Sequence, residues 1–428
     1  MSAIPRLPLT RNIRRGAAPF SRAEYEQADG YLAVRDTLGK VEPASLITLI
    51  AASGLGGCGG GGFPTGRKWQ LMPGKDQRPG PRYLVINADE MEPGTFKDRL
   101  LLEGDPHQMI EGIILSAYAL QADHAYIFVR GEYLTAIERL NHAIAEAEAA
   151  GLIGENILGS GFDLSVQVHG GAGRYICGEE TALLNSLEGR RAIPRSKPPF
   201  PQVNGLWGCP TIVNNVETIC NVPHIVRYGA DWYRGLGVNG ALGTKIYGVS
   251  GRVRNPGTFE LPMGTPMRDM IEDHAGGMKE GYRLTAVLPG GASTAFLMAE
   301  NLDVPMTFAD MAKHGTRLGT GTAIVLDDKT CPVGFIANLQ QFFARESCGW
   351  CAPCRDGLPW VERTLKSIEA GEGRATDLDL LLEMTGNLGP GRTFCALAPG
   401  AMASLQSGLQ YFGPVFEQHI ATKACPWT

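Results

Sequence analysis

The sequence contains no apolar run near the roughly 18 residues that a membrane-spanning helix requires. The best candidate, Ile113–Leu120, is too short. The amino terminus lacks the apolar core of a secretory signal. Its five arginines before Glu24 only faintly resemble a mitochondrial presequence, so an ordinary bacterial amino terminus is the favoured interpretation. We therefore expect a chain without a membrane span of its own.

A strong excess of either charge is also missing. The formal net charge of the 428 residues is −5, and no basic tract suggests nucleic acid or an anionic membrane surface as a partner. A composition of 44% hydrophobic and 19% charged residues is typical of a soluble globular protein, and the length allows two or three domains. Ten cysteines in a chain without a secretory signal favour thiols or metal ligands over disulfides.

The usual dinucleotide fingerprint, GxGxxG after a strand, is absent, but another glycine-rich stretch is present. Residues 54–69 read GLGGCGGGGFPTGRKW, with seven glycines between Gly54 and Gly62. Without Cβ atoms, such a loop lets backbone N–H groups approach a phosphate or a flat ring. Phe63 offers a stacking surface, and Lys68 offers a positive charge. Because a helix-like run precedes the loop and another element follows it, the stretch predicts a nucleotide-type ligand rather than a flexible linker.

A second polar stretch, residues 174–201, reads RYICGEETALLNSLEGRRAIPRSKPPFP. Glu179 and Glu180 suit the positive end of a helix that Gly189 can end. Basic residues then stand among prolines, which suits a stiff rim over a bound anion: Arg190, Arg191, Arg195 and Lys197. A helix cap followed by a solvated basic loop remains the alternative.

Strand-like and helix-like patterns alternate through the first half of the chain. Strands are predicted at Tyr83–Asn87, Ala125–Val129 and Phe162–Val168, and helices at 107–122 and 134–150. A further helix-like run, Ala23–Leu38, ends an amino-terminal arm. Strands separated by helices predict a parallel sheet whose ligand crevice lies at the carboxyl ends of the strands.

The predicted secondary structure changes twice in the second half of the chain. Short β-like runs at Lys245–Ser250, Leu284–Leu288 and Thr322–Leu326 alternate with glycine-rich turns, with one amphipathic helix at Met267–His274. This part shows no chemistry, so a structural or docking role is preferred. Helical patterns dominate from about Pro332.

Four cysteines in the helical part have ligand spacing. Cys348, Cys351 and Cys354 form CxxCxxC, and Cys395 is available from a later element. This arrangement favours a 4Fe–4S cluster, because zinc more often uses two separated pairs. The other six cysteines lack ligand spacing, and most are interpreted as buried hydrophobic residues: Cys58, Cys177, Cys209, Cys220, Cys331 and Cys425.

Together with NADEMEPGTFKDR (residues 87–99) and ESCGWCAPCRDGLPW (residues 346–360), these stretches resemble the family of the F-type or 51-kDa subunit of respiratory complex I, which binds flavin and NADH. The likeness extends from about Tyr31 to about Tyr411. It implies an α/β protein with a parallel-sheet (Rossmann-like) FMN domain, a β-grasp (SLBB-type) insert and a carboxyl-terminal helical-bundle iron–sulfur domain. The expected divisions are an arm at 1–40, the FMN/NADH domain at 41–238, the β-grasp domain at 239–330 and the cluster domain at 331–428.

The resemblance also implies the site residues, with Cys348, Cys351, Cys354 and Cys395 as cluster ligands. FMN contacts are expected from Gly57, Gly59, Gly60, Gly61, Lys68, Asn87, Asp89, Glu90, Tyr175, Gly178, Glu179, Asn214, Asn215 and Thr218. For the two asparagines, a helix cap is the alternative. NADH is expected to stack over the flavin, with adenine between Phe63 and Phe200, and with Glu92, Glu180 and Lys197 near the ribose and phosphates. No side chain is expected to act as acid or base, since Glu90 and Glu179 only position the reactants.

The implied activity is electron input to complex I, from NADH through FMN and the cluster to quinone. The implied partners are a thioredoxin-like 2Fe–2S subunit and a large multi-cluster iron–sulfur subunit, in the peripheral arm at the cytoplasmic face of the bacterial inner membrane. A diaphorase subunit of an NAD-linked hydrogenase or formate dehydrogenase is the alternative enzyme, and a nucleotide-binding scaffold with a structural cluster is the non-enzymatic one. Cys58 departs from the family pattern, which usually has arginine there.

Overall fold

The computed structural model describes residues 5–427, so residues 1–4 of the predicted arm lie outside it. The chain divides into two compact units. Among the described residues, the first comprises 5–91, 96–246 and 260–264, and the second comprises 92–95, 247–259 and 265–427. Within the described residues, no helix combines the length and the apolar character needed to cross a membrane.

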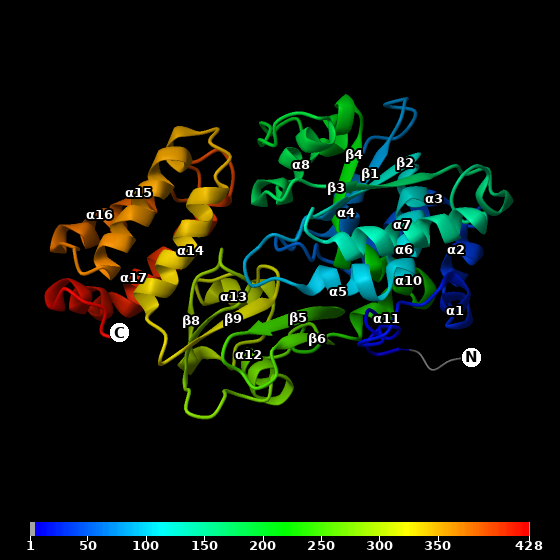
Figure 1. The fold of residues 1–428 in the computed structure, drawn as a ribbon. Coiled ribbons are helices and arrows are strands. Elements are labelled where there is room, and N and C mark those ends of the chain that lie inside the picture. The colour runs from blue at the N-terminus through cyan, green and yellow to red at the C-terminus, as the bar shows by residue number, and fades with distance from the viewer. Residues whose placement is uncertain (1–4, 428) are drawn as a thin grey trace. The chain divides into compact units, whose positions relative to one another are not determined.

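The first unit is built on a four-stranded parallel sheet in the order β3-β2-β1-β4 (Figure 1). Its strands are β1 (Tyr83–Ala88), β2 (His124–Val129), β3 (Ser165–Gly170) and β4 (Thr211–Asn215). The predicted parallel sheet is confirmed. The third strand begins three residues later than predicted, at Ser165 instead of Phe162, and β4 was not predicted.

Helices cover this sheet and bury its apolar side chains. Those that pack against the strands are α6 (Pro106–Leu120), α7 (Leu134–Ala149), the single turn α9 (Pro201–Asn204) and α10 (Val216–Tyr228). Asp105 caps α6, since its Oδ1 accepts from the backbone N–H of Gln108 at 3.3 Å. Leu84 and Ile86 of β1 and Ile113 of α6 are fully buried in one continuous core. Burial of these apolar side chains stabilises the packing of the helices on the sheet.

The single amino-terminal helix predicted at Ala23–Leu38 is wrong. The chain forms two short helices there, α1 (Arg22–Gln27) and α2 (Leu32–Thr37). Asp29 and Tyr31 have φ angles of 68° and 57°, which interrupt a right-handed helix on either side of Gly30. Tyr25 and Tyr31 are buried in the core of the first unit.

The second sheet has the strand order β6-β5-β9-β7-β8. Its strands are β5 (Thr244–Ser250), β6 (Gly257–Pro262), β7 (Leu284–Leu288), β8 (Leu297–Met298) and β9 (Thr322–Asp327). The three predicted runs agree with β5, β7 and β9 to within one residue at either end. The short strands β6 and β8 were not predicted. The predicted helix after residue 266 is α12 (Met267–Asp269), continued by a π-helical turn through His274.

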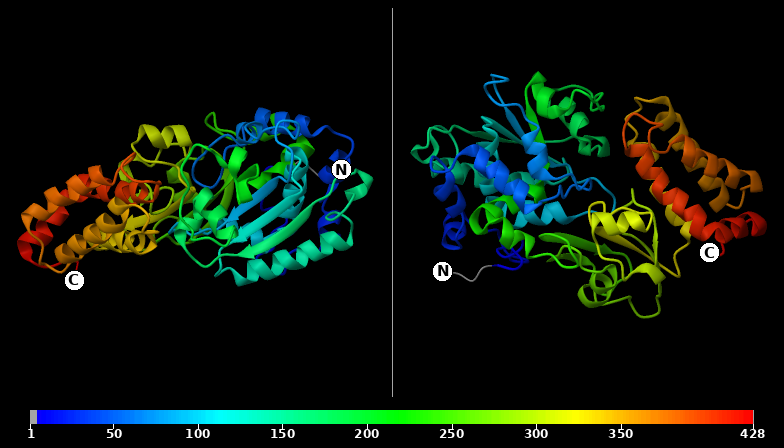
Figure 2. Two further views of the ribbon diagram at one scale, coloured as in Figure 1. Left: turned by 90° about the horizontal axis from the view of Figure 1, so that it is seen from above. Right: turned by 180° about the vertical axis from the view of Figure 1, so that it is seen from behind.

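Four helices make up the carboxyl-terminal part: α14 (Pro332–Glu346), α15 (Ala352–Glu369), α16 (Ala375–Asn387) and α17 (Leu397–Thr422). They lie side by side as a bundle, which the two views of Figure 2 show in yellow to red. Phe343, Leu358 and Phe416 are buried between them. The predicted helical domain is confirmed, and the four cysteines of the motif lie in its helix connections or in the first turn of α15.

Candidate functional site

The glycine-rich loop connects α3 (Pro43–Ser53) to α4 (Thr65–Gln70) and folds back on itself. The N–H of Gly57 donates to the carbonyl of Phe63 at 2.9 Å. A Cβ on Gly59 would lie 3.2 Å from the Cβ of Asn215, whereas a Cβ on Gly61 would meet nothing within 4 Å. Gly60 has a φ of 114°, which a residue with a side chain rarely adopts. One side of the loop is therefore pressed against the end of β4, and the other side is open to a ligand.

Cys58 ties this loop to α10. Its N–H donates to Oγ1 of Thr218 at 2.9 Å. Burial, followed by the charge of Glu217, raises the pKa of the Cys58 thiol to about 11. The thiol stays protonated at neutral pH, which favours the interpretation of Cys58 as a small buried residue over a reactive thiol.

The carboxyl ends of β1 and β4 carry three asparagines that are held by hydrogen bonds. Asn87 Nδ2 donates to the carbonyl of Gly178 at 2.9 Å, and Asn214 Oδ1 accepts from Trp69 Nε1 at 2.9 Å. Asn215 caps α10, because its Oδ1 accepts from the N–H of Glu217 at 3.1 Å. The alternative of a helix cap thus describes Asn215 in this structure. These bonds bring the glycine-rich loop and the two strand ends to one edge of the sheet, where ligands of parallel sheets bind.

Two glutamates and two lysines form a charged cluster beside this edge. Glu180, the first residue of α8 (Glu180–Leu187), lies 2.8 Å from both Lys68 Nζ and Lys197 Nζ. Burial acts to raise the pKa of Glu180, but the charges of the two lysines outweigh it and lower the pKa to about 2. Glu179 caps α8 through the N–H groups of Thr181 and Ala182, and also accepts from Lys197 at 3.1 Å. The cluster joins the two polar stretches identified in the sequence, since Lys68 belongs to residues 54–69 and its other three members belong to residues 174–201.

Arg195 of the proline-rich loop is less available than predicted, whereas Arg190 and Arg191 are exposed. Arg195 pairs with Glu188 at 2.8 Å and donates to Asn185 and to the carbonyl of Gly205. The prediction that Arg195 contributes its charge to a rim over a bound anion is therefore wrong. Its contacts hold the loop in place instead. Lys197 is the basic side chain of the loop that joins the charged cluster.

Glu90, which follows β1, is a buried carboxyl engaged with the protein. It accepts from the N–H groups of Asp98 and Arg99 at 2.8 and 3.1 Å, and from Tyr133 Oη at 3.0 Å. Burial, followed by the charge of Asp98, raises the pKa of Glu90 to about 7. The carboxyl is therefore partly protonated at neutral pH while it caps the start of α5 (Lys97–Gly104).

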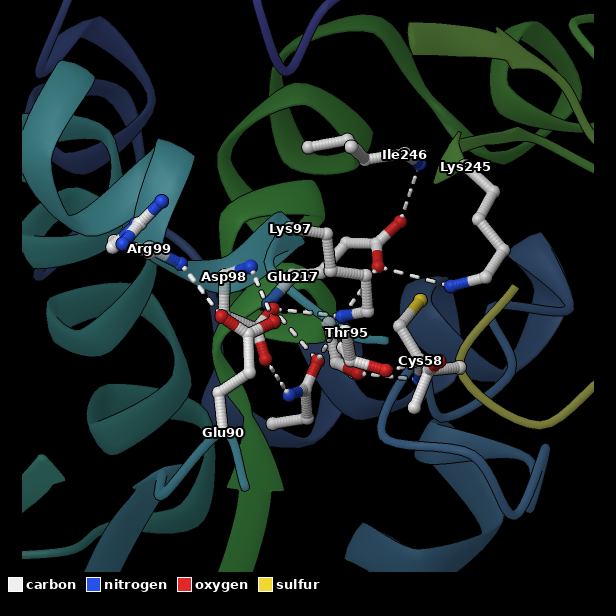
Figure 3. A network of polar contacts seen from close by, with 12 residues as sticks. Cys58, Glu90, Thr95, Lys97, Asp98, Arg99, Glu217, Lys245 and Ile246 are labelled. Atoms are coloured by element: carbon white, nitrogen blue, oxygen red, sulfur yellow. Dashed lines mark hydrogen bonds and ion pairs between the residues drawn. The ribbon is translucent and has the colours of Figure 1, made fainter. Parts of the chain in front are cut away.

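Next to Glu90 lies a buried network of charges that sequence reasoning missed (Figure 3). Lys97 Nζ lies 2.7 Å from Asp98 Oδ1 and 2.7 Å from Glu217 Oε2. Lys245 Nζ lies 3.0 Å from the same Glu217 oxygen, and the second oxygen of Glu217 accepts from the N–H of Ile246 at 2.8 Å. Burial acts to lower the pKa of Lys97, but Asp98 and Glu217 raise it overall, so this lysine stays charged. The network reaches the strand edge through Asn215, which donates to Asp98 at 2.7 Å.

The aromatic candidates are open, and the remaining acidic candidate belongs to the second unit. Phe63 and Phe200 are 49% and 53% exposed, so each ring offers surface to a stacking partner. Tyr175 begins a single 3₁₀ turn that ends at Gly178. Glu92 accepts from the N–H of Ser293 at 2.7 Å within the second unit. Asp89 stands two residues after Asn87, and the N–H of Asp89 donates to Oδ1 of Asn87 at 3.2 Å.

The four cysteines of the motif lie at the ends of helices in the bundle. Cys348 lies in the α14–α15 connection, Cys351 occupies the position just before α15, Cys354 lies in the first turn of α15 and Cys395 precedes α17. Burial raises the pKa of Cys354 to about 12; a hydrogen bond from Ser347 acts against this, and the charges of the other three cysteines add to it. All four cysteines thus stand at or beside helix ends of one bundle, a placement that fits a cluster held by four thiolates.

Family models match three parts of the chain. A Nuo51 FMN-binding domain matches residues 50–224, an SLBB domain matches 246–297, and the NADH-ubiquinone oxidoreductase-F iron–sulfur binding region matches 334–419. The predicted fold class and the predicted FMN and iron–sulfur cofactors agree with these matches.

Curated relatives match almost the whole chain. The F-type subunit of the NADH-quinone oxidoreductase of Salmonella typhimurium is 54% identical over 413 residues, which cover 96% of this chain and 93% of the relative. The Escherichia coli protein of the same name has the same identity and coverage. Among solved structures, a chain of an NAD⁺-reducing [NiFe]-hydrogenase in the H₂-reduced state superimposes with a TM-score of 0.82 at 33% identity, covering 95% of this chain and 67% of that one.

Proposed function

Because the chain belongs to the family of F-type subunits of NADH-quinone oxidoreductase, we propose that it takes a hydride from NADH and passes the electrons on singly through an iron–sulfur cluster. The observation that carries this proposal is the presence of both sites in one chain. A glycine-rich loop meets the ends of parallel strands, and four cysteines with iron–sulfur spacing share one helical bundle.

The residues at the strand edge fit FMN. The open side of Gly61 and the positive φ of Gly60 form a cradle that side chains would fill, which suits close approach of a phosphate or a flat ring. We propose that FMN is held by Gly57, Gly59, Gly60, Gly61, Lys68, Asn87, Asp89, Glu90, Tyr175, Gly178, Glu179, Asn214, Asn215 and Thr218. FMN, when bound, supplies the conversion between a two-electron hydride donor and one-electron acceptors. No side chain is required as a general acid or base, and Glu90 and Glu179 act by positioning.

For NADH we propose stacking of the adenine on Phe63 and Phe200, with Glu92, Glu180 and Lys197 facing the ribose and phosphates. The exposure of both phenylalanines and the ionised state of Glu180 support this assignment. A carboxylate accepts hydrogen bonds from ribose hydroxyls and repels the additional phosphate of NADPH. Cys348, Cys351, Cys354 and Cys395 are the proposed cluster ligands.

The assembly is likewise proposed. The chain offers a flavin site and one cluster motif, so its electrons need a further acceptor. We propose a thioredoxin-like 2Fe–2S subunit and a large multi-cluster subunit as partners, in the peripheral arm at the cytoplasmic face of a bacterial inner membrane. Trp350 and Phe394, exposed beside Cys351 and Cys395, support an exit side on the helical bundle. The divisions at residues 40, 238 and 330 are the proposed domain boundaries.

A second candidate is a diaphorase subunit of an NAD-linked hydrogenase. The likeness to the NAD⁺-reducing [NiFe]-hydrogenase chain favours it, although this chain spans only about two thirds of that chain. Both candidates share NADH oxidation and differ in the final acceptor. Anaerobic addition of NADH to the purified protein should bleach the flavin absorbance, whereas an unchanged spectrum with FMN bound would favour a nucleotide-binding scaffold.

Replacing Glu180 by glutamine is expected to relax the preference for NADH over NADPH. The change removes the carboxylate between Lys68 and Lys197 and leaves those two cations to attract a 2′-phosphate. A charged hydrogen bond of about 1–3 kcal/mol corresponds to a roughly 5- to 150-fold change in the ratio of kcat/KM values. Steady-state kinetics with both cofactors measure that ratio.

The matched control is Glu26→Gln, since the Glu26 carboxylate also lies between two cations, Arg22 and Arg35, but on α1. The control should leave the ratio unchanged. Equal ratios for the wild type and Glu180→Gln would move the role to Glu179 or Glu92.

A further inference from the structure

A second group of potential metal ligands lies in the helical bundle, outside the cysteine motif. It contains Cys331 at the start of α14, Glu369 at the end of α15, His419 near the end of α17 and Cys425 just beyond it. One ligand atom from each residue lies within 4.8 Å of all the others. We propose that these four residues bind one zinc ion.

The distances in this group have the size expected for a tetrahedral ligand set. Cys331 Sγ lies 3.3 Å from His419 Nε2 and 3.6 Å from Glu369 Oε2, and these nitrogen and oxygen atoms lie 3.4 Å apart. Zinc bonds of about 2.0–2.3 Å at tetrahedral angles separate the ligand atoms by about 3.3–3.8 Å. The separations between the ligand atoms of these three residues therefore match those around a tetrahedral zinc ion, and Cys425 supplies the fourth ligand.

The hydrogen bond of His419 fixes the tautomer that a metal requires. Its Nδ1 lies 2.8 Å from the carbonyl oxygen of Val415, and a carbonyl can only accept, so Nδ1 carries the proton. The lone pair of a neutral His419 is then on Nε2, the atom that faces Cys331 and Glu369. Histidine ligands in metal sites commonly donate their second N–H to a backbone carbonyl in this manner. The ring is fully buried, so bulk water does not compete for Nε2.

The chain end is folded against the site. The ring of Trp427 stacks on His419 with centroids 6.3 Å apart, and its Nε1 donates to the carbonyl of Asp328 at 3.4 Å. Gly371, two residues after Glu369, faces residue 423 so closely that a Cβ would lie 2.1 Å from the carbonyl oxygen of Lys423. These contacts hold Cys425 near the ends of α15 and α17.

The donor set selects zinc over other common ions. Two thiolates, one imidazole and one carboxylate suit zinc, whereas magnesium and calcium take oxygen ligands. Binding requires deprotonation of the two thiols, so uptake of Zn²⁺ releases two protons and involves no electron transfer.

The zinc position is remote from the cysteine motif. Cys331 begins α14 and Cys348 follows its end, and Glu369 ends α15 while Cys351 precedes its start. At about 1.5 Å per residue, these helices of 15 and 18 residues separate the two sites by roughly 22–27 Å. Zinc here would clamp three helices at the far end of the bundle that carries the cluster.

The test is metal analysis of the purified full-length protein with zinc K-edge X-ray absorption, which does not detect the iron. We expect one zinc per chain, with two sulfur neighbours at about 2.3 Å and two nitrogen or oxygen neighbours at about 2.0–2.1 Å. His419→Gln and Cys425→Ser should each lower the zinc content at least tenfold and leave iron and sulfide unchanged. Cys209→Ser is the matched control, because Cys209 is a partly exposed cysteine of the first unit. This variant should keep the zinc. Because Cys425 lies outside the helices, its variant remains informative where His419→Gln fails to fold.

Three results would overturn the proposal. The first is the absence of bound zinc in protein that was expressed with zinc supplied. The second is zinc with four sulfur neighbours, which would place it in the cysteine motif, or with none, which would mark surface binding. The third is a Cys331–Cys425 disulfide in the peptide mass spectrum. Loss of iron alone would bear on the proposed function and not on this site.

Discussion

Replacing Lys97 by methionine is expected to lower the free energy of unfolding of the first unit by about 3–5 kcal/mol. This is the usual cost of removing one partner from a buried ion pair. Lys97 is only 1% exposed and contacts both Asp98 and Glu217, whose side chains are also buried. Without its cation, the network holds two carboxylates against Lys245 alone. Urea unfolding followed by circular dichroism measures the change.

Two further variants isolate the charge effect. Adding Asp98→Asn to Lys97→Met restores a neutral network, so the double variant should be more stable than the single one. Lys75→Met removes a lysine whose pair with Asp123 is solvent-exposed, and such pairs contribute only about 0–1 kcal/mol. Equal losses for Lys97→Met and Lys75→Met would contradict the assignment of a buried ionic network.

Replacing Cys395 by alanine is expected to abolish the normal four-iron cluster and to preserve reduction of the flavin by NADH. The remaining thiols, Cys348, Cys351 and Cys354, leave one iron without its cysteine ligand. Iron and acid-labile sulfide should fall from about four each per flavin, and the electron paramagnetic resonance signal of the reduced cluster should disappear. Bleaching of the flavin on addition of NADH should continue, because the glycine-rich loop belongs to the other unit.

Cys209→Ala is the control for this experiment, since Cys209 is partly exposed and lies outside the motif. It should retain iron, sulfide and the cluster signal. Recovery of zinc without sulfide in the wild-type motif would show that the four cysteines hold a different metal.

The sequence predicted those elements whose residues carry a strong local signal. The strand pattern at Tyr83–Asn87 and the helix pattern at 107–122 predicted β1 and α6 correctly, because the local signal there agrees with the final packing. Strand β4 was missed because its five residues end in two asparagines that read equally well as a helix cap, and Asn215 is both. The helix expected at Ala23–Leu38 was too long because a left-handed turn at Asp29 outweighed the apolar periodicity.

The candidate sites also divide into those with a local sequence signal and those that depend on tertiary packing. Local motifs identified the glycine-rich loop, the Glu179–Glu180 pair and the CxxCxxC cysteines. The partners of Lys97 and the group around His419 could not be found, because Glu217 is 120 residues from Lys97 and Cys425 is 94 residues from Cys331. Contacts of this kind depend on tertiary packing and leave no spacing in the sequence. Cys331 and Cys425 are only partly buried, unlike the fully buried Cys220, so the hydrophobic interpretation was too general.

The most direct test of the central proposal is to follow NADH oxidation with two acceptors while partner subunits are added stepwise to the purified chain. The chain carrying FMN and its cluster, alone or with the small partner, should reduce ferricyanide with NADH and should fail to reduce quinone at a physiological rate. Quinone reduction should begin only when the assembly is complete. Robust, inhibitor-sensitive quinone reduction by this chain alone would contradict the account of an electron-input subunit and would identify a self-contained quinone reductase.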